Sequence, residues 1–174
     1  MHERGNLDLS RDTYLEIIEK KTAVLYAASC ECGARYAGGS PAAVSALHDY
    51  GMGLGMAFQI VDDVLDLTGD EAVVGKSLGT DLARCKLTLP LIHYLQTGPA
   101  EQVSEIREIL SEGRGAEEAG RIRAAVIDNG SVEHAMEDAR SRIRAAIDGL
   151  SALPESEGRD LLVALAEYTL VRRR

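Results

Sequence analysis

One long helical pattern between Ser40 and Gly69 sets the main limit on the architecture of this chain. Ser40 followed by Pro41 is typical of a helix start, because an N-cap residue is followed by proline at the first helical position. Gly69 is a natural residue to end the same helix. The pattern therefore predicts a helix over Pro41–Thr68, about 42 Å long, which favours a large helical bundle.

The rest of the chain also shows helical periodicity and no sustained alternation of a strand, so we predict an all-α fold. A first helix is expected to begin at Ser10, as its N-cap, and to run to about Tyr36. We expect a polar loop with little regular structure over Gly69–Lys86, and a loop of this length is usually functional. By its length, the chain should form a single domain over residues 1–174. The remaining predicted helices cover residues 88–96, 100–111, 116–129, 132–150 and 156–172.

Composition and charge exclude several classes of protein. Lys and Arg number 19 against 28 Asp and Glu, a formal charge of −9, which argues against a general nucleic-acid binder. No stretch reaches the roughly 18 apolar residues of a membrane span, and no secretory signal follows Met1, so we expect a cytoplasmic protein. Cys30, Cys32 and Cys85 are expected to be reduced, buried thiols.

Three acidic residues, Asp62, Asp63 and Asp66, lie near the end of the long, otherwise apolar helix. Asp62 and Asp66 are four residues apart and share one helix face with Gln59, while Asp63 lies beside them. Mutual repulsion, burial and the negative end of the helix dipole all disfavour these charges. Mg²⁺ would offset all three costs, because it binds one or two carboxylates together with water and phosphate oxygens. The alternative interpretation is a solvated acidic face on a surface helix.

Basic residues around the acids favour the metal interpretation. Lys76 and Lys86 flank the predicted loop, and Lys20-Lys21-Thr22 lies on the first helix. Lysines close to metal-binding carboxylates would form a site for a polyanion such as diphosphate. The alternative interpretation is that each lysine is an ordinary solvated cation.

Four segments resemble the second aspartate-rich motif and the lysine loop of the trans-isoprenyl (polyprenyl) diphosphate synthases. They are Phe58–Asp66, Gly75-Lys76, Gly79–Leu82 and Lys86–Pro90. Further resemblance covers most of the chain, from about Leu7 to its end, through Lys21-Thr22-Ala23, Glu167-Tyr168 and Arg172–Arg174. One departure is Cys85, which stands where the family usually has Gly.

The resemblance implies a helical bundle of the isoprenoid synthase type and a Mg²⁺-dependent, head-to-tail condensation of isopentenyl diphosphate with an allylic diphosphate. Gln59 and Thr22 would support the developing cation or orient the proton acceptor, and Asp81 would position the loop. The resemblance implies that Asp62, Asp63 and Asp66 bind Mg²⁺. It also implies that Lys21, Lys76 and Lys86 bind the diphosphate oxygens.

The family also carries a first aspartate-rich motif, and residues 1–174 contain no second Asp-Asp-x-x-Asp. The chain therefore resembles the C-terminal half of a synthase, which we expect to be incomplete and inactive alone. It is expected to need the N-terminal half or a partner subunit, in a homo- or hetero-oligomer. Four interpretations of the chain follow: a fragment of a synthase, a non-catalytic small subunit, a degenerate relative, or an unrelated helical interaction module.

Overall fold

The computed structural model describes residues 6–68 and 79–172, and every regular element in these ranges is a helix. The all-α prediction is therefore confirmed. The chain divides into two compact units. We call them the first unit (Met1–Tyr14, Asp62–Met136 and Arg173–Arg174) and the second unit (Leu15–Val61 and Glu137–Arg172).

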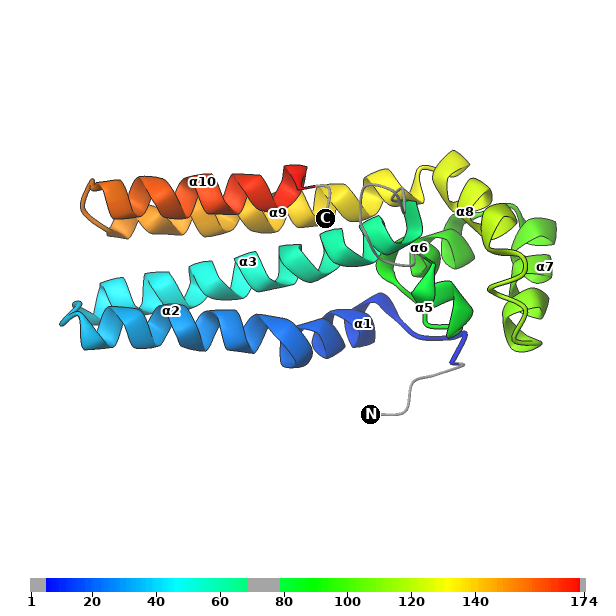
Figure 1. The fold of residues 1–174 in the computed structure, drawn as a ribbon, viewed down its shortest axis with the longest axis horizontal. Helices are drawn as coiled ribbons and strands as arrows, with labels where there is room; N and C mark the ends of the chain where they lie inside the picture. The colour runs from blue at the N-terminus through cyan, green and yellow to red at the C-terminus, as the bar shows by residue number, and fades with distance from the viewer. Residues whose placement is uncertain (1–5, 69–78, 173–174) are drawn as a thin grey trace. The chain divides into compact units, whose positions relative to one another are not determined.

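The second unit contains most of the long helices, which are coloured blue to cyan and yellow to red in Figure 1. Three helices have residues in both units: α1, α3 and α9. The elements of this part of the chain are α1 (Arg11–Ile18), the π-helical turn η1 (Glu19–Ala23), α2 (Val24–Tyr36), α3 (Pro41–Thr68), α9 (Ser131–Gly149), the 3₁₀ turn η2 (Leu150–Ala152) and α10 (Glu157–Val171).

Within the second unit, α3 packs closely against three other helices. A Cβ atom at Gly51 would lie 2.6 Å from the carbonyl oxygen of Tyr26 on α2. A Cβ atom at Gly53 would lie 3.1 Å from that of Ala146 on α9. The Tyr50 hydroxyl donates to a backbone carbonyl of α10, over 2.7 Å. Small residues on α3 thus allow its backbone to approach α2 and α9, and its apolar surface forms the centre of this unit.

Local capping explains where the first helices begin, and both predicted N-caps are confirmed. The Ser10 hydroxyl accepts from the Thr13 amide at 3.1 Å, and the Ser40 hydroxyl accepts from the Ala43 amide at 3.2 Å. Helix α3 has the bounds predicted from the sequence. The first predicted helix is continuous in extent, but the π-helical turn η1 separates α1 from α2.

Among the residues that the structure describes, the first unit is built largely from four short helices, shown in green to yellow in Figure 1. Many of their apolar residues are buried, among them Leu89, Leu91, Ile109 and Ile122. Helix α8 begins three residues later than the sequence predicts. The four helices are α5 (Thr80–Ala83), α6 (Leu89–Thr97), α7 (Ala100–Ser111) and α8 (Ala119–Asp128).

The predicted loop contains one short helix, and the prediction of buried thiols is wrong. The loop predicted over Gly69–Lys86 contains the one-turn helix α5, and its residues 69–78 lie outside the described part of the chain. The three thiols are free but none is buried: Cys32 is exposed, and Cys30 and Cys85 are partly exposed. Residues two positions apart in a helix are rotated by about 200° around its axis and so lie on nearly opposite sides. Cys30 and Cys32 therefore do not both face the core.

In the described ranges, the structure contains no helix that combines the length and hydrophobicity needed to cross a membrane.

Candidate functional site

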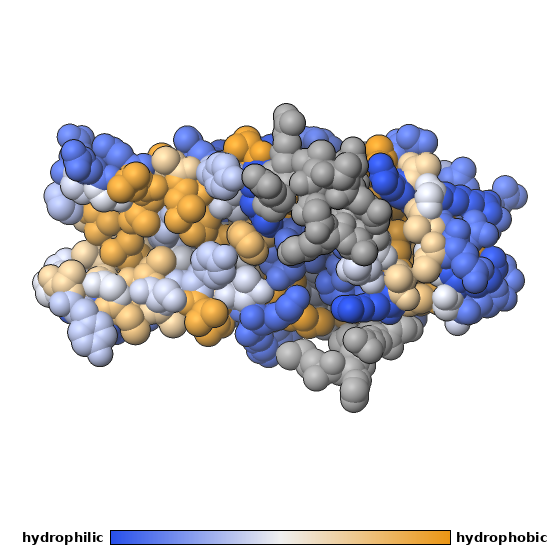
Figure 2. Space-filling view, in the orientation of Figure 1, coloured by the Kyte–Doolittle hydropathy of each residue, from blue (hydrophilic) through white to orange (hydrophobic). Residues whose placement is uncertain are grey.

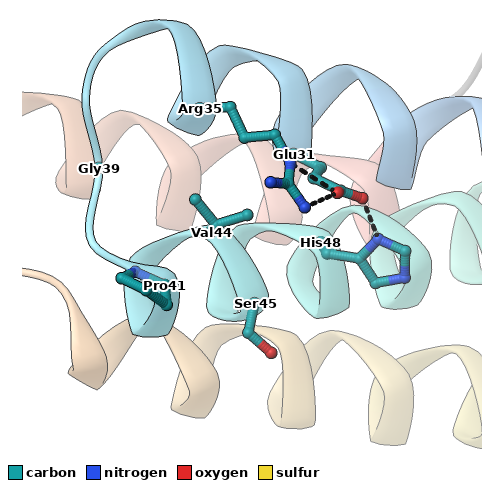
Figure 3. A pocket seen from close by; sticks show the side chains of 7 residues that line it. All are labelled: Glu31, Arg35, Gly39, Pro41, Val44, Ser45 and His48. Atoms are coloured by element: carbon teal, nitrogen blue, oxygen red, sulfur yellow. Dashed lines mark hydrogen bonds and ion pairs between the residues drawn. The ribbon is translucent and has the colours of Figure 1, made fainter.

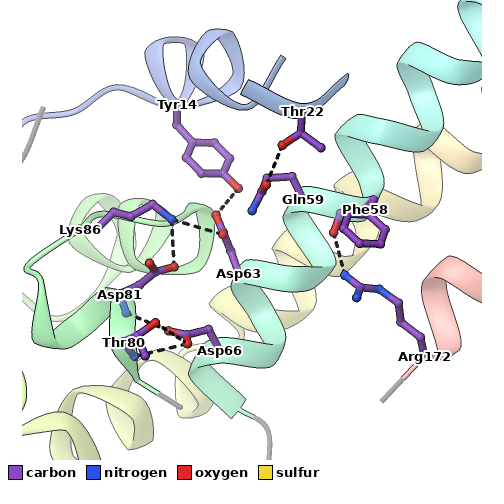
Figure 4. A network of polar contacts seen from close by, with 10 residues as sticks. All are labelled: Tyr14, Thr22, Phe58, Gln59, Asp63, Asp66, Thr80, Asp81, Lys86 and Arg172. Carbon is purple, nitrogen blue, oxygen red and sulfur yellow. Dashed lines mark hydrogen bonds and ion pairs between the residues drawn. The ribbon is translucent and has the colours of Figure 1, made fainter. Parts of the chain in front are cut away.

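Asp63 is the buried centre of a polar network in the first unit (Figure 4). Its side chain comes from the last turns of α3 and the residue is only 2% exposed. The Tyr14 hydroxyl donates to Oδ2 at 2.8 Å, and the Lys86 ammonium group donates to Oδ1 at 3.4 Å. A buried carboxylate is costly unless it is paired and hydrogen-bonded. One neutral donor and one cation therefore stabilise Asp63 in its buried position.

Lys86 lies between two carboxylates. Its ammonium group also donates to Oδ2 of Asp81, at 3.0 Å. Burial lowers the pKa of Lys86, but the negative charges of Asp63 and Asp81 outweigh this effect and raise the pKa overall. The side chain keeps 37% of its surface exposed. Lys86 is therefore a permanent positive charge at neutral pH that remains accessible from solvent.

Asp66 ties the end of α3 to the start of α5. Its Oδ1 accepts from the Thr80 amide at 3.3 Å and from the Thr80 hydroxyl at 3.0 Å, and its Oδ2 accepts from the Asp81 amide at 3.0 Å. The Gly79 amide donates to the backbone carbonyl of Asp66 at 2.8 Å. First-turn amides of a helix need acceptors, and a carboxylate provides them. These contacts explain why a short helix forms within the loop that the sequence predicts.

Asp62 differs from its neighbour Asp63, because it is exposed. The solvated-face interpretation thus describes Asp62 but not Asp63. Within residues 6–68 and 79–172, no three His, Cys, Asp or Glu side chains are close enough together to hold an ion. Mg²⁺ usually takes only one or two carboxylates and completes its shell with water and phosphate oxygens. The donor chemistry therefore fits an ion that arrives with a diphosphate, and the three metal ligands remain a prediction.

Thr22 and Gln59 form a separate polar pair in the second unit. The Thr22 hydroxyl, on η1, donates to Oε1 of Gln59 on α3 at 2.9 Å, and Gln59 is 6% exposed. The structure thus brings together two residues that lie 37 positions apart in the sequence. The neighbouring Lys21 is an exposed residue of this unit. Lys76 lies outside the described residues.

Tyr14 is a candidate site residue that sequence reasoning missed. No motif marks it, and the sequence suggests only an aromatic residue on the apolar side of the first helix. The structure gives its hydroxyl a buried carboxylate partner 49 residues away. A tyrosine at a core-facing position is the available signal, since a buried tyrosine hydroxyl usually needs a hydrogen-bond partner.

Arg172, at the end of α10, contacts α3 within the second unit. Its guanidinium group donates to the carbonyl oxygen of Phe58 at 3.0 Å and lies 4.0 Å from the centre of the Phe58 ring. A cation over an aromatic ring is attracted to it, and the planar guanidinium group suits this position. Arg172 therefore holds the end of α10 against α3 at Phe58, the residue that precedes Gln59.

A separate hollow of about 550 Å³ in the second unit lacks comparable chemistry (Figure 3). Glu31 accepts from the Arg35 guanidinium group at 2.7 and 2.9 Å and from His48 Nδ1 at 2.9 Å. Two hydrogen bonds lower the pKa of Glu31: the one from Arg35 has the larger effect and the one from His48 the smaller. The residues lining the hollow balance one another's charge, and we assign it no function. They are Glu31, Arg35, Gly39, Pro41, Val44, Ser45 and His48.

Known proteins resemble this chain in both sequence and structure. The octaprenyl diphosphate synthase of Haemophilus influenzae is 39% identical over 165 residues, which cover 95% of this chain and 50% of that protein. The octaprenyl diphosphate synthase of Escherichia coli is 36% identical, over 96% of this chain and 52% of that protein. The crystal structure of a Caulobacter crescentus polyprenyl synthase, complexed with calcium and isoprenyl diphosphate, has a TM-score of 0.93 and 35% identity. That match covers 99% of this chain and 53% of the other.

The chain spans about half the length of the curated relatives it matches. The sequence model of the polyprenyl synthetase family matches residues 1–128, which is well over half of the chain. The all-α isoprenoid synthase fold of the structural neighbours agrees with the helical architecture described above. On this combined support, the chain belongs to the polyprenyl synthetase family.

Proposed function

We propose that this chain supplies part of the active site of a polyprenyl diphosphate synthase, which condenses isopentenyl diphosphate head-to-tail with an allylic diphosphate. The network of Asp63, Lys86 and Asp81 supports this most directly. It combines buried negative charge with a solvent-accessible ammonium group, the two elements that binding of a metal–diphosphate complex requires.

In this proposal, the residues of the chain bind and orient the allylic diphosphate. Mg²⁺, when bound, would neutralise the departing diphosphate. The lysines would contact the diphosphate oxygens, and Gln59, oriented by the Thr22 hydroxyl, would present its amide dipole to the developing cation. The ligands to the metal would be Asp62, Asp63 and Asp66, and the lysines would be Lys21, Lys76 and Lys86.

We further propose that the chain works with an N-terminal half of the same family, either in one polypeptide or as a separate subunit. The relatives are about twice as long as this chain, which supports a missing half. Four large apolar side chains on one side of α10 are exposed, and an exposed apolar patch favours a binding partner. These residues are Leu161, Leu165, Tyr168 and Val171.

Incorporation of labelled isopentenyl diphosphate, with an allylic diphosphate and Mg²⁺, tests the proposed activity. We expect no turnover by the purified chain, and turnover after addition of the N-terminal half of the Haemophilus influenzae relative. Turnover by the chain alone would contradict the proposed need for a second half. Absence of turnover in the mixture, together with absence of Mg²⁺-dependent diphosphate binding, would contradict the prenyltransferase function itself.

The alternative function, a non-catalytic small subunit, makes a different prediction for the same mixture. If the chain only supports a catalytic partner, then Asp63→Asn should leave turnover within about twofold of the parent. If Asp63 belongs to the active site, the substitution should abolish most of the turnover. The result therefore separates the two functions, and the partner protein stays the same in both arms.

The substitution Asp62→Asn tests the proposed metal site. Because Asp62 is exposed, the helix should remain intact while Mg²⁺-dependent binding of inorganic diphosphate weakens by about tenfold or more. Without metal, relief of repulsion between the acids should raise stability by about 0.2–0.5 kcal/mol. Calorimetric titration with diphosphate, and thermal unfolding in EDTA, measure the two effects.

Asp49→Asn is the matched control, because Asp49 is an exposed aspartate on the same helix, far along the sequence from the acidic motif. It should leave diphosphate binding unchanged. Equal binding by the Asp62→Asn variant and the parent would refute Asp62 as a metal ligand.

A further inference from the structure

Tyr14 contacts the polar network through its hydroxyl group. Its ring belongs to α1 and the residue is 2% exposed, while its hydroxyl donates to Oδ2 of Asp63 at 2.8 Å. The aromatic ring and the carboxylate point toward each other across the network in Figure 4. We propose that Tyr14 is a positioning residue that orients the Asp63 carboxylate for cation binding, an inference that rests on the proposed function.

The two oxygens of Asp63 have different kinds of partners. Oδ1 faces the Lys86 ammonium group at 3.4 Å, and Oδ2 accepts from the neutral Tyr14 hydroxyl. Donors on both oxygens oppose rotation of the carboxylate group about its own axis. A neutral donor adds no positive charge beside Asp63, whereas a second ammonium group there would repel an approaching cation. Tyr14 thus orients Asp63 without competing for its charge.

Hydrogen bonds that hold a metal-binding side chain in place orient it toward the ion, and their loss typically weakens metal binding by about 10–100-fold. In Tyr14→Phe, Asp63 would keep the Lys86 contact but lose the hydroxyl donor to Oδ2. The carboxylate could then turn toward Lys86. We expect binding of inorganic diphosphate at fixed Mg²⁺ to weaken by about tenfold. The Mg²⁺ concentration needed for half-maximal binding should rise as well.

Tyr50→Phe is a matched control for a purely structural role. Tyr50 is 1% exposed, and its hydroxyl donates to the Leu162 carbonyl oxygen at 2.7 Å, within the second unit. Each substitution removes a hydroxyl group that donates a hydrogen bond from a buried tyrosine, so both should lower the melting temperature. Only Tyr14→Phe should change the Mg²⁺ dependence of diphosphate binding, while binding by Tyr50→Phe should stay close to that of the parent.

A double-mutant cycle in EDTA tests the Tyr14–Asp63 interaction without any ligand. The melting temperatures of Tyr14→Phe, Asp63→Asn and the double variant are compared with that of the parent chain. We expect the double variant to lose less than the sum of the two single losses. Additive losses would overturn the inference, because they would show that the two side chains are not energetically coupled.

The outcomes of the binding experiment are distinguishable. Weaker binding by Tyr14→Phe, with parental binding by Tyr50→Phe, supports the positioning role. If the parent binds diphosphate with Mg²⁺ and both tyrosine variants bind equally well, the positioning role fails and the proposed function stands. If the parent itself binds no diphosphate in the presence of Mg²⁺, the proposed site fails, and the positioning role fails with it.

Discussion

At the residue scale, Cys85 combines an unusual backbone conformation with a position next to a lysine of the candidate site. Its φ angle of 48° lies in the left-handed region, where a side chain with a Cβ atom is disfavoured. It directly precedes Lys86, whose ammonium group contacts Asp63 and Asp81. The resemblance described in the sequence analysis implies Gly at this position, and glycine adopts this conformation without the Cβ penalty.

We therefore predict that Cys85→Gly stabilises the protein. The gain from relieving backbone strain should exceed the entropic cost of glycine in the unfolded chain, for a net increase of about 0.5–1 kcal/mol in the free energy of unfolding. Urea unfolding measures it. Cys32→Gly is the control, since Cys32 is exposed on the regular helix α2 and glycine should destabilise it there. A less stable Cys85→Gly variant would contradict the proposed strain.

At the element scale, glycines on α3 allow close packing of the helices in the second unit. At Gly51, an added Cβ atom would lie 2.6 Å from the carbonyl oxygen of Tyr26 and 2.7 Å from Cα of Ala27. These are backbone atoms of α2, so rotation of a side chain would not relieve the contact. The two helices would have to separate, and the packing between them would be lost along their length.

We predict that Gly51→Ala lowers the free energy of unfolding by about 2 kcal/mol or more, because the core becomes overpacked. Gly33→Ala, on α2, provides the opposite case, because nothing lies within 4 Å of the position that its Cβ atom would take. That variant should gain about 0.5–1 kcal/mol from higher helix propensity. Chemical unfolding of both variants measures the difference, and equal stabilities would contradict the packing argument.

At the scale of the whole molecule, an apolar stripe on α10 is exposed. It consists of Leu161, Leu165, Tyr168 and Val171, which are 71%, 50%, 60% and 70% exposed. Their spacing of four, three and three residues places them on one side of the helix, opposite the buried Ala166. Apolar surface is visible over this part of the second unit in Figure 2. Such a stripe is typical of a surface that another helix covers.

We predict that the purified chain self-associates through this stripe when no N-terminal half is present. The double substitution Leu161→Lys and Leu165→Lys should make the chain monomeric, because it places two charges in the contact. Ile127→Lys is the control, since Ile127 is an exposed apolar residue on α8, in the first unit. Sedimentation equilibrium measures association. Unchanged association of the double variant would show that α10 is not the contact surface.

Features that depend on local interactions could be predicted from the amino-acid sequence. The N-caps at Ser10 and Ser40 and the bounds of α3 follow from neighbouring residues, because capping and periodicity act within a few positions of the chain. The grouping of Thr22 with Gln59, and of Lys86 with the acids, followed from resemblance to the polyprenyl synthases, which the comparisons support as the family.

The difference between two adjacent aspartates depends on tertiary packing and could not be predicted from the sequence. Asp62 is exposed and Asp63 is buried, although they share a helix and a side-chain type. Successive helical residues point about 100° apart, so their surroundings depend on which segments pack against each side of α3. Tyr14 and Lys86 are 49 and 23 positions from Asp63 along the chain. Contacts over such separations cannot be predicted from local sequence patterns. The chemistry available to Asp63 is therefore a property of packing, which chain folding creates by bringing distant donors to one carboxylate.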